Sequence, residues 1–167
     1  MQRRAFLSLS ATAAALSLAG CGFALRKAPD FAFTKLYTNM SSSTLGVELR
    51  RSLQSTGKVE VINDARRLNE AQVVLDVLSD QREKVVLSTN AAGQVREFQL
   101  RLRFRFKLRT LAGKELIPDS EILQQRDISF NESAVLAKEA EEALLYRDMQ
   151  NDIVQQIMRR LAAVTEL

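Results

Sequence analysis

Between residues 98 and 109, apolar and polar side chains alternate without interruption. Every even position carries Phe or Leu, and every odd position is polar. An alternation of period two over this length predicts a half-buried antiparallel strand, about 40 Å long at about 3.3 Å per residue. Asn and Gly in segment 89–94 favour a tight turn, so we expect a hairpin with a preceding strand over 73–87.

Shorter elements are predicted before this hairpin. Segments 31–37 and 58–62 have the composition of strands, although the alternation in the first is imperfect. Between them, leucines recur at every fourth residue behind the Ser and Thr residues of 41–44, which suit an N-cap, and Gly57 suits a helix terminator. The leucines of this predicted helix are Leu45, Leu49 and Leu53.

A long helix is predicted at the C-terminal end of the chain. Asn131 or Ser133 supplies its N-cap, and we expect it to end near Leu167. Its acidic residues, which cluster in segment 138–142, are expected to lie on a solvated face. Its apolar stripe consists of Leu145, Met149, Ile153, Ile157 and Leu161.

The predicted fold class is α+β. A last strand over 115–130, in which Pro118 favours an edge position or a strand entrance, completes the order β-α-β-β-β-β-α. The natural arrangement is two helices packed on one face of a mostly antiparallel, mixed sheet of four to five strands. We expect residues 31–167 to form this single domain.

The first twenty residues have the pattern of an export signal. Arg3 and Arg4 precede an apolar stretch of roughly 14 residues, which is short of the ~20 needed to span a bilayer. The segment Leu18-Ala19-Gly20-Cys21 resembles the bacterial lipobox, which is cleaved before a cysteine that carries diacylglycerol. We therefore expect a lipoprotein signal peptide over 1–20 and a lipid-anchored tether over 21–30. The paired arginines leave both general secretion and twin-arginine export open.

Cys21 is the only cysteine of the chain, so the expected lipid would sit on the only thiol. We expect diacylglycerol and an N-acyl chain on Cys21 and no other cofactor. Two or more acyl chains hold a protein on a membrane essentially permanently. By resemblance to lipoprotein sorting rules, Gly22 after the cysteine implies delivery to the outer membrane, with the domain on the periplasmic side. The alternative is an ordinary secreted protein with a buried cysteine.

Composition argues against most kinds of active site. The 167 residues include no histidine, so a Cys/His zinc site and a Ser-His-Asp triad are excluded, and one cysteine excludes a disulfide framework. The net charge of +4 falls by two when Arg3 and Arg4 leave with the signal, which does not indicate nucleic-acid binding. We predict a non-enzymatic protein without a metal site. A Ser-Lys or carboxylate site is the remaining enzymatic alternative.

One face of the alternating strand carries a row of five bases. These are Arg101, Arg103, Arg105, Lys107 and Arg109. The row repels itself unless negative groups lie opposite. In one interpretation, acidic residues of the neighbouring strands form ion pairs with these bases. The acidic residues are Asp76, Asp80, Asp119, Glu121 and Asp127. In the other, part of the row meets an anionic lipid or another protein.

Several motifs resemble the LptE family of lipopolysaccharide-assembly lipoproteins. The start of the mature chain, Cys21-Gly22-Phe23-Ala24-Leu25-Arg26, is similar to the family's Cys-Gly-aromatic-x-Leu-Arg opening. Segment 93–99 resembles its hairpin, segment 49–53 with Gly57 its first helix, and segments 136–139 and 149–161 its C-terminal helical region. The similarity covers nearly the whole mature chain.

The resemblance implies a 1:1 complex with an LptD-type outer-membrane β-barrel, which the domain plugs and helps to assemble, and binding of lipopolysaccharide. Lys138 matches a basic family position associated with lipopolysaccharide. The hairpin tip lacks the basic residue of some relatives, so the expected contacts shift to Arg82, Lys84 and Arg96. The alternative function is another periplasmic lipoprotein adaptor, such as a secretin pilot or an envelope-assembly scaffold.

Overall fold

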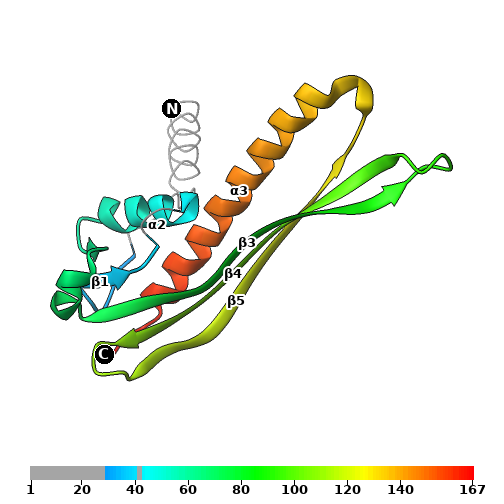
Figure 1. Cartoon of the computed structure of the whole chain (residues 1–167). Coiled ribbons are helices and arrows are strands. Elements are labelled where there is room, and N and C mark those ends of the chain that lie inside the picture. The colour runs from blue at the N-terminus through cyan, green and yellow to red at the C-terminus, as the bar shows by residue number, and fades with distance from the viewer. Residues whose placement is uncertain (1–28, 41–42) are drawn as a thin grey trace, which may run out of the picture.

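The computed structural model describes residues 29–40 and 43–167. The predicted signal peptide, Cys21 and most of the predicted tether lie outside these described residues. The described chain forms a five-stranded sheet in the order β2-β1-β3-β4-β5, with α2 and α3 on one face (Figure 1). This arrangement confirms the predicted α+β class.

The bounds of the elements lie close to those predicted. The strands are β1 (Lys35–Thr38), β2 (Glu60–Ile62), β3 (Val73–Thr89), β4 (Val95–Thr110) and β5 (Glu115–Ser129). The helices are α2 (Thr44–Ser55) and α3 (Val135–Ala162), with short 3-10 turns η1 (Ala65–Glu70) and η2 (Glu132–Ala134). β1 runs parallel to β2 and β3, whereas β3, β4 and β5 are antiparallel.

Three details differ from the sequence-based expectation. The turn η1 was not predicted, because its sequence contains no apolar periodicity. α3 ends at Ala162, before the expected Leu167. Asn131 does accept a hydrogen bond from the Ser133 main-chain N–H, but it caps η2, and α3 begins at the end of that turn without a side-chain cap.

The core is built on the apolar row of β4. The side chains of Leu100, Phe104, Phe106 and Leu108 are fully buried, and Leu102 is nearly so. They pack with the predicted leucines of α2 and the stripe of α3 in one cluster. Burying each such side chain contributes roughly 1.5–3 kcal/mol before entropy is counted. The clearest pattern of the sequence therefore forms the centre of the fold.

A β-bulge at Leu78 reverses the side-chain alternation of β3. Val77 lies opposite Phe106 and Ser79 opposite Arg105, so Leu78 is an extra residue in the ladder. Before the bulge the odd positions of β3 share a face with the apolar row of β4, and after it the even positions do. Polar side chains of β3 therefore face the helices along the second half of the strand.

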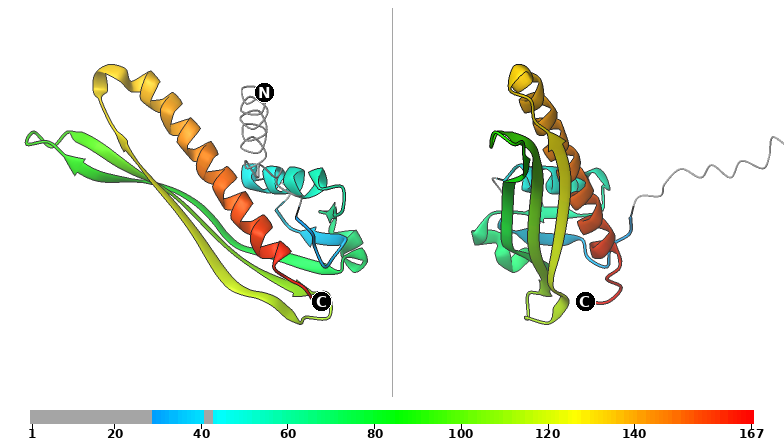
Figure 2. Two further views of the ribbon diagram at one scale, coloured as in Figure 1. Left: turned by 180° about the vertical axis from the view of Figure 1, so that it is seen from behind. Right: turned by 90° about the vertical axis from the view of Figure 1, so that its right-hand side faces the viewer.

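The sheet and α3 separate toward the hairpin tip. Figure 1 and the left view of Figure 2 show the β3–β4 hairpin and the start of α3 diverging. The first fully buried side chain of α3 is Tyr146, and segment 135–145 contains none. We call the space between segment 135–145 and the sheet the wedge.

Gly46 provides a test of the packing between α2 and the segment before it. A Cβ atom at this position would lie 1.9 Å from the Met40 carbonyl oxygen. Gly46→Ala should therefore destabilise the domain by about 1–3 kcal/mol in urea unfolding, although Gly to Ala normally stabilises a helix. Val47→Ala, at an exposed neighbouring position, is the control and should change little. A Gly46→Ala variant as stable as the parent would contradict this packing.

Candidate functional site

Three of the four predicted lipopolysaccharide-binding residues meet in the wedge. Arg82 and Lys84 lie opposite Leu102 and Leu100 of β4, so they point to the helix side of the sheet. Lys138 reaches the same space from the first turn of α3. The bulge at Leu78 is the cause, because without it Arg82 and Lys84 would face the open side.

Glu142 of α3 holds the two bases of β3. Its carboxylate lies 2.6 Å from the Lys84 Nζ and 3.6 Å from an Arg82 guanidinium nitrogen. The Glu142 side chain is only 17% exposed, against 38% for Lys84 and 56% for Arg82. The expectation that segment 138–142 is a solvated face is therefore wrong for Glu142, which closes over the sheet.

Lys138 is held in a similar way by nearby oxygen atoms. Its Nζ donates to the Ser129 hydroxyl at 2.9 Å and to the Glu141 carboxylate at 2.8 Å. Its side chain is 22% exposed. Each base of the wedge thus has a carboxylate partner, and an anionic ligand would have to compete with that partner.

Two aromatic rings lie against Arg82 and Lys84. The Tyr146 hydroxyl donates to the Glu83 carbonyl oxygen at 2.6 Å, and the Arg82 guanidinium lies 3.5 Å from the centroid of the same ring. The Lys84 Nζ lies 4.3 Å from the Phe98 centroid, a cation–π distance. The four-residue spacing of Lys138, Glu142 and Tyr146 on one helix face was the available signal for this cluster.

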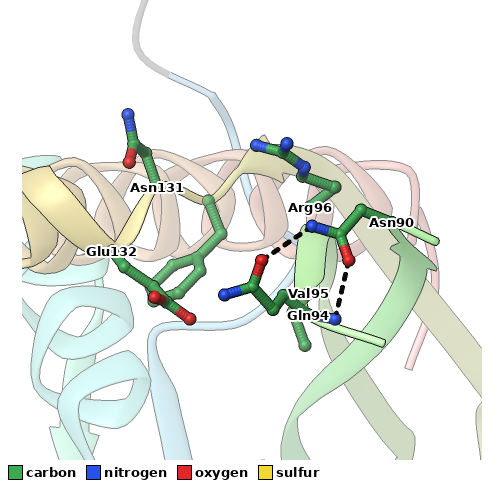
Figure 3. Close-up of a pocket in the computed structure, with 7 residues that line it drawn as sticks. Asn90, Gln94, Val95, Arg96, Asn131 and Glu132 are labelled. Atoms are coloured by element: carbon green, nitrogen blue, oxygen red, sulfur yellow. Dashed lines mark hydrogen bonds between the residues drawn. The ribbon is translucent and has the colours of Figure 1, made fainter. Parts of the chain in front are cut away.

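Two cavities lie at this end of the molecule, and Phe130 lines both. The first, of about 210 Å³, has an apolar floor and charged residues at its rim; it is lined by Lys84, Phe98, Ile128, Ser129, Phe130, Val135, Lys138, Glu139 and Glu142. The second, of about 120 Å³, is polar and is drawn in Figure 3. Its lining consists of Asn90, Gln94, Val95, Arg96, Phe130, Asn131 and Glu132.

Arg96, the fourth predicted residue, lines the polar cavity rather than the cavity that contains Lys138. Its carbonyl oxygen accepts a hydrogen bond from the Phe130 N–H at 2.7 Å, which joins the hairpin to the start of the α3 connection. The structure therefore brings Arg82, Lys84 and Lys138 together and places Arg96 in the adjacent cavity.

The predicted basic row of β4 lies on the opposite, open face of the sheet. Arg103 pairs with Glu121 at 3.0 Å, Arg109 pairs with Asp76 at 2.7 Å, and Arg105 pairs with Asp119. The hydrogen bond that the Arg105 guanidinium donates to the Asp119 carboxylate raises the pKa of that guanidinium. Acidic residues of β3 and β5 thus form ion pairs with three of the five bases.

The other two bases of the row have no ion pair within the described residues. Arg101 donates to the Gln99 side chain at 2.7 Å, and no carboxylate lies within 4.0 Å of the Lys107 Nζ. Asp127 accepts from Gln99 instead of from a base. Asp80 was expected to face the row, but it lies opposite Phe104 on the helix side, because the bulge at Leu78 changes its face.

Residues 29–40 and 43–167 contain neither a candidate metal site nor a candidate membrane span. No group of three or more acidic or cysteine side chains is placed to hold a metal ion. No helix in this part of the chain is both long and apolar enough to cross a membrane.

Comparison with known proteins gives the class of the molecule. The solution structure of lipoprotein B from Nitrosomonas europaea superposes with a TM-score of 0.72 and 34% identity, covering 86% of this chain and 92% of that one. The crystal structure of rare lipoprotein B from Shewanella oneidensis has the same fold, with a TM-score of 0.63 and 23% identity over 78% and 93% of the two chains. The fold is thus that of a small α+β lipoprotein domain.

Sequence comparison then gives the family. The family model LptE, described as lipopolysaccharide-assembly, matches residues 33–161. LPS-assembly lipoprotein LptE of Pectobacterium atrosepticum is 28% identical over 154 residues, which is 90% of this chain and 82% of the relative. The chain belongs to the LptE lipopolysaccharide-assembly family, as its motifs indicated, and a role in lipopolysaccharide assembly follows from this membership.

The contact between Tyr146 and β3 can be tested directly. Tyr146→Phe removes one partly buried hydrogen bond to the Glu83 carbonyl and should lower the free energy of unfolding by about 1 kcal/mol. Amide exchange should increase in β3 around residue 83. Tyr37→Phe, at the other tyrosine of the chain, is the control and should change stability by less than about 0.5 kcal/mol. Equal effects of the two changes would disprove the anchoring role of Tyr146.

Proposed function

We propose that this protein is an outer-membrane lipoprotein that binds lipopolysaccharide in the wedge. In this proposal, acyl chains on Cys21 anchor it to the periplasmic side of the membrane. The folded domain occupies the lumen of an LptD-type β-barrel in a 1:1 complex. There it assists assembly of the barrel and delivery of lipopolysaccharide to the cell surface. Membership of the LptE family and the lipobox at Cys21 support the proposal.

The observation that carries the binding proposal is the convergence of Lys84 and Lys138 at the rim of a largely apolar cavity. Arg82 lies beside them, because it shares the Glu142 carboxylate with Lys84. Lipopolysaccharide is an amphiphile with phosphate groups and acyl chains. Lys and Arg bind phosphate through short, charge-assisted hydrogen bonds. A rim of bases around an apolar floor therefore matches both parts of such a ligand.

The carboxylates of the wedge determine how binding should respond to mutation. Glu142 neutralises Lys84 and Arg82 in the free protein, and Glu141 neutralises Lys138. A phosphate must displace these carboxylates before it can use the bases. Removing the charge of Glu142 should then strengthen binding, while removing that of Lys138 should weaken it.

The open face of the sheet supports the barrel part of the proposal. It carries a ladder of ion pairs between β4 and its two neighbours. The lumens of large outer-membrane barrels are polar. A domain with its apolar face under its own helices and a charged face outward suits such a lumen.

Opposite effects of two charge changes test the binding site. Lys138→Ala should weaken binding of purified lipopolysaccharide about tenfold at low salt, since a charge-assisted hydrogen bond contributes about 1.5–3 kcal/mol. Glu142→Gln should tighten it several-fold, because Lys84 and Arg82 lose their internal partner. Surface-bound lipopolysaccharide and a salt series give the dissociation constants.

Lys107→Ala is the matched control for this measurement, because it removes one Lys charge from the opposite face of the sheet. Its affinity for lipopolysaccharide should equal that of the parent. If Lys138→Ala and Lys107→Ala behave alike, or if Glu142→Gln also weakens binding, the wedge is not the site.

Isolation from native membranes tests the proposed partner. The full-length protein, extracted in mild detergent, should co-purify with one large β-barrel in equal amounts. Cys21→Ala should prevent acylation and leave the domain folded, because the thiol precedes the folded core. A free monomer in the extract, or a different stable partner such as a secretin, would favour the adaptor function instead.

A further inference from the structure

The core beneath α3 is incomplete at the hairpin end. From Tyr146 onward, α3 buries a continuous stripe against β4. In segment 135–145 the side chains are exposed or half-buried, and Leu136 and Leu144 are 82% and 50% exposed. The apolar row of β4 nevertheless continues under this segment to Phe98, which is only half-buried. The sheet thus offers apolar surface that the helix does not cover.

The cavity of about 210 Å³ lies at this end of the sheet, over the half-buried Phe98. Ile128, 4% exposed, and Phe98 belong to the end of the main core and form its apolar floor. Phe130 packs edge to face on Phe98 at a centroid distance of 5.4 Å, and Val135 approaches from α3. Ordered water needs two or more polar partners, which such a floor does not supply. An apolar group is the occupant that this floor suits.

The rim of the same cavity determines what kind of apolar ligand fits. Lys84, Lys138, Glu139 and Glu142 line it and are more exposed than Ile128. A ligand whose apolar part rests on Phe98 and Ile128 has its other end beside the two lysines. This juxtaposition matches a hydrocarbon chain that ends in an anionic head group.

We infer that the cavity formed by Phe98, Ile128, Phe130 and Val135 binds one hydrocarbon chain of an anionic amphiphile, with Lys84 and Lys138 beside its phosphate. This inference rests on the proposed function and deepens it, because it assigns a place in the wedge to an acyl chain. Polar contacts through Glu142 and Lys138 hold segment 135–145 near the sheet, so the chain can enter without breaking a packed apolar interface.

Monomeric alkyl phosphates of increasing length test the inference without any saccharide. If the chain is buried, each added methylene from hexyl to decyl phosphate should tighten binding roughly fourfold, the factor equivalent to about 0.8 kcal/mol. Inorganic phosphate should bind far more weakly than octyl phosphate. Titration calorimetry below the micelle concentration gives the dissociation constants.

A cavity-filling substitution locates the chain. Val135 is 38% exposed, so Val135→Phe should fold while it fills part of the cavity. Decyl phosphate should bind the parent much more tightly than hexyl phosphate does. In Val135→Phe the ratio of these two affinities should be at least tenfold smaller than in the parent. Leu136→Phe adds a phenyl ring on the neighbouring exposed position, outside the cavity lining, and should leave the series unchanged.

A fluorescence reporter gives a second measurement. The chain contains no tryptophan, so Phe130→Trp introduces a single one at the wall of the cavity. Octyl phosphate with a terminal bromine should quench this tryptophan, and 2-bromoethyl phosphate should not. Quenching by both compounds alike, or by neither, would overturn the inference.

The remaining outcomes separate the inference from the proposed function. Affinity that is independent of chain length, or an unchanged series in Val135→Phe, would overturn the chain site even if lipopolysaccharide still binds and still depends on Lys138. Absence of lipopolysaccharide binding would overturn the proposed function and with it the assignment of this cavity to that ligand.

Discussion

The structure depends on the packing of one strand against one helix. The apolar row of β4 and the stripe of α3 bury each other from Tyr146 to the end of the helix, and α2 extends the same core over β1 and β2. This interface fixes the direction of α3 across the sheet. Because the stripe stops at Tyr146 while the row of β4 continues to Phe98, the two elements separate at the hairpin end. The wedge therefore exists because one apolar pattern is longer than the other.

The bulge at Leu78 decides what the wedge contains. Without the extra residue, the odd positions would continue to face the helices, which would place Ser79, Gln81 and Glu83 there. The extra residue turns Arg82 and Lys84 toward the helix instead, where Glu142 receives them. The same change leaves Glu83 on the open face, across from Arg101. A single inserted residue thus provides a polar site on the apolar side of the sheet.

Most of the fold could be predicted from the sequence, because its periodicities are long and local. The alternation of β4, the leucines of α2 and the stripe of α3 each repeat several times, and Gly57 and Gly93 both take the positive φ expected of terminator and turn residues. The candidate site was harder to predict from the sequence. The run Val73–Leu78 is apolar at nearly every position, so it gives no sign of where the alternation changes. For the same reason Asp80 was assigned to the wrong face. The four-residue spacing of Lys138, Glu142 and Tyr146 places them on one helix face, but it does not say which residues of β3 lie opposite.

Polar groups of the hairpin tip form hydrogen bonds with one another. The Asn90 side chain accepts from the Gln94 main-chain N–H and donates to the Gln94 side chain (Figure 3). It also accepts from the Ala92 N–H, and the Asn90 N–H donates to the Gln94 carbonyl oxygen. A projecting loop of this kind does not rely on surrounding water for its shape. It can therefore move from open solvent into a narrow, partly dehydrated space without losing its conformation, and little ordering entropy opposes that transfer.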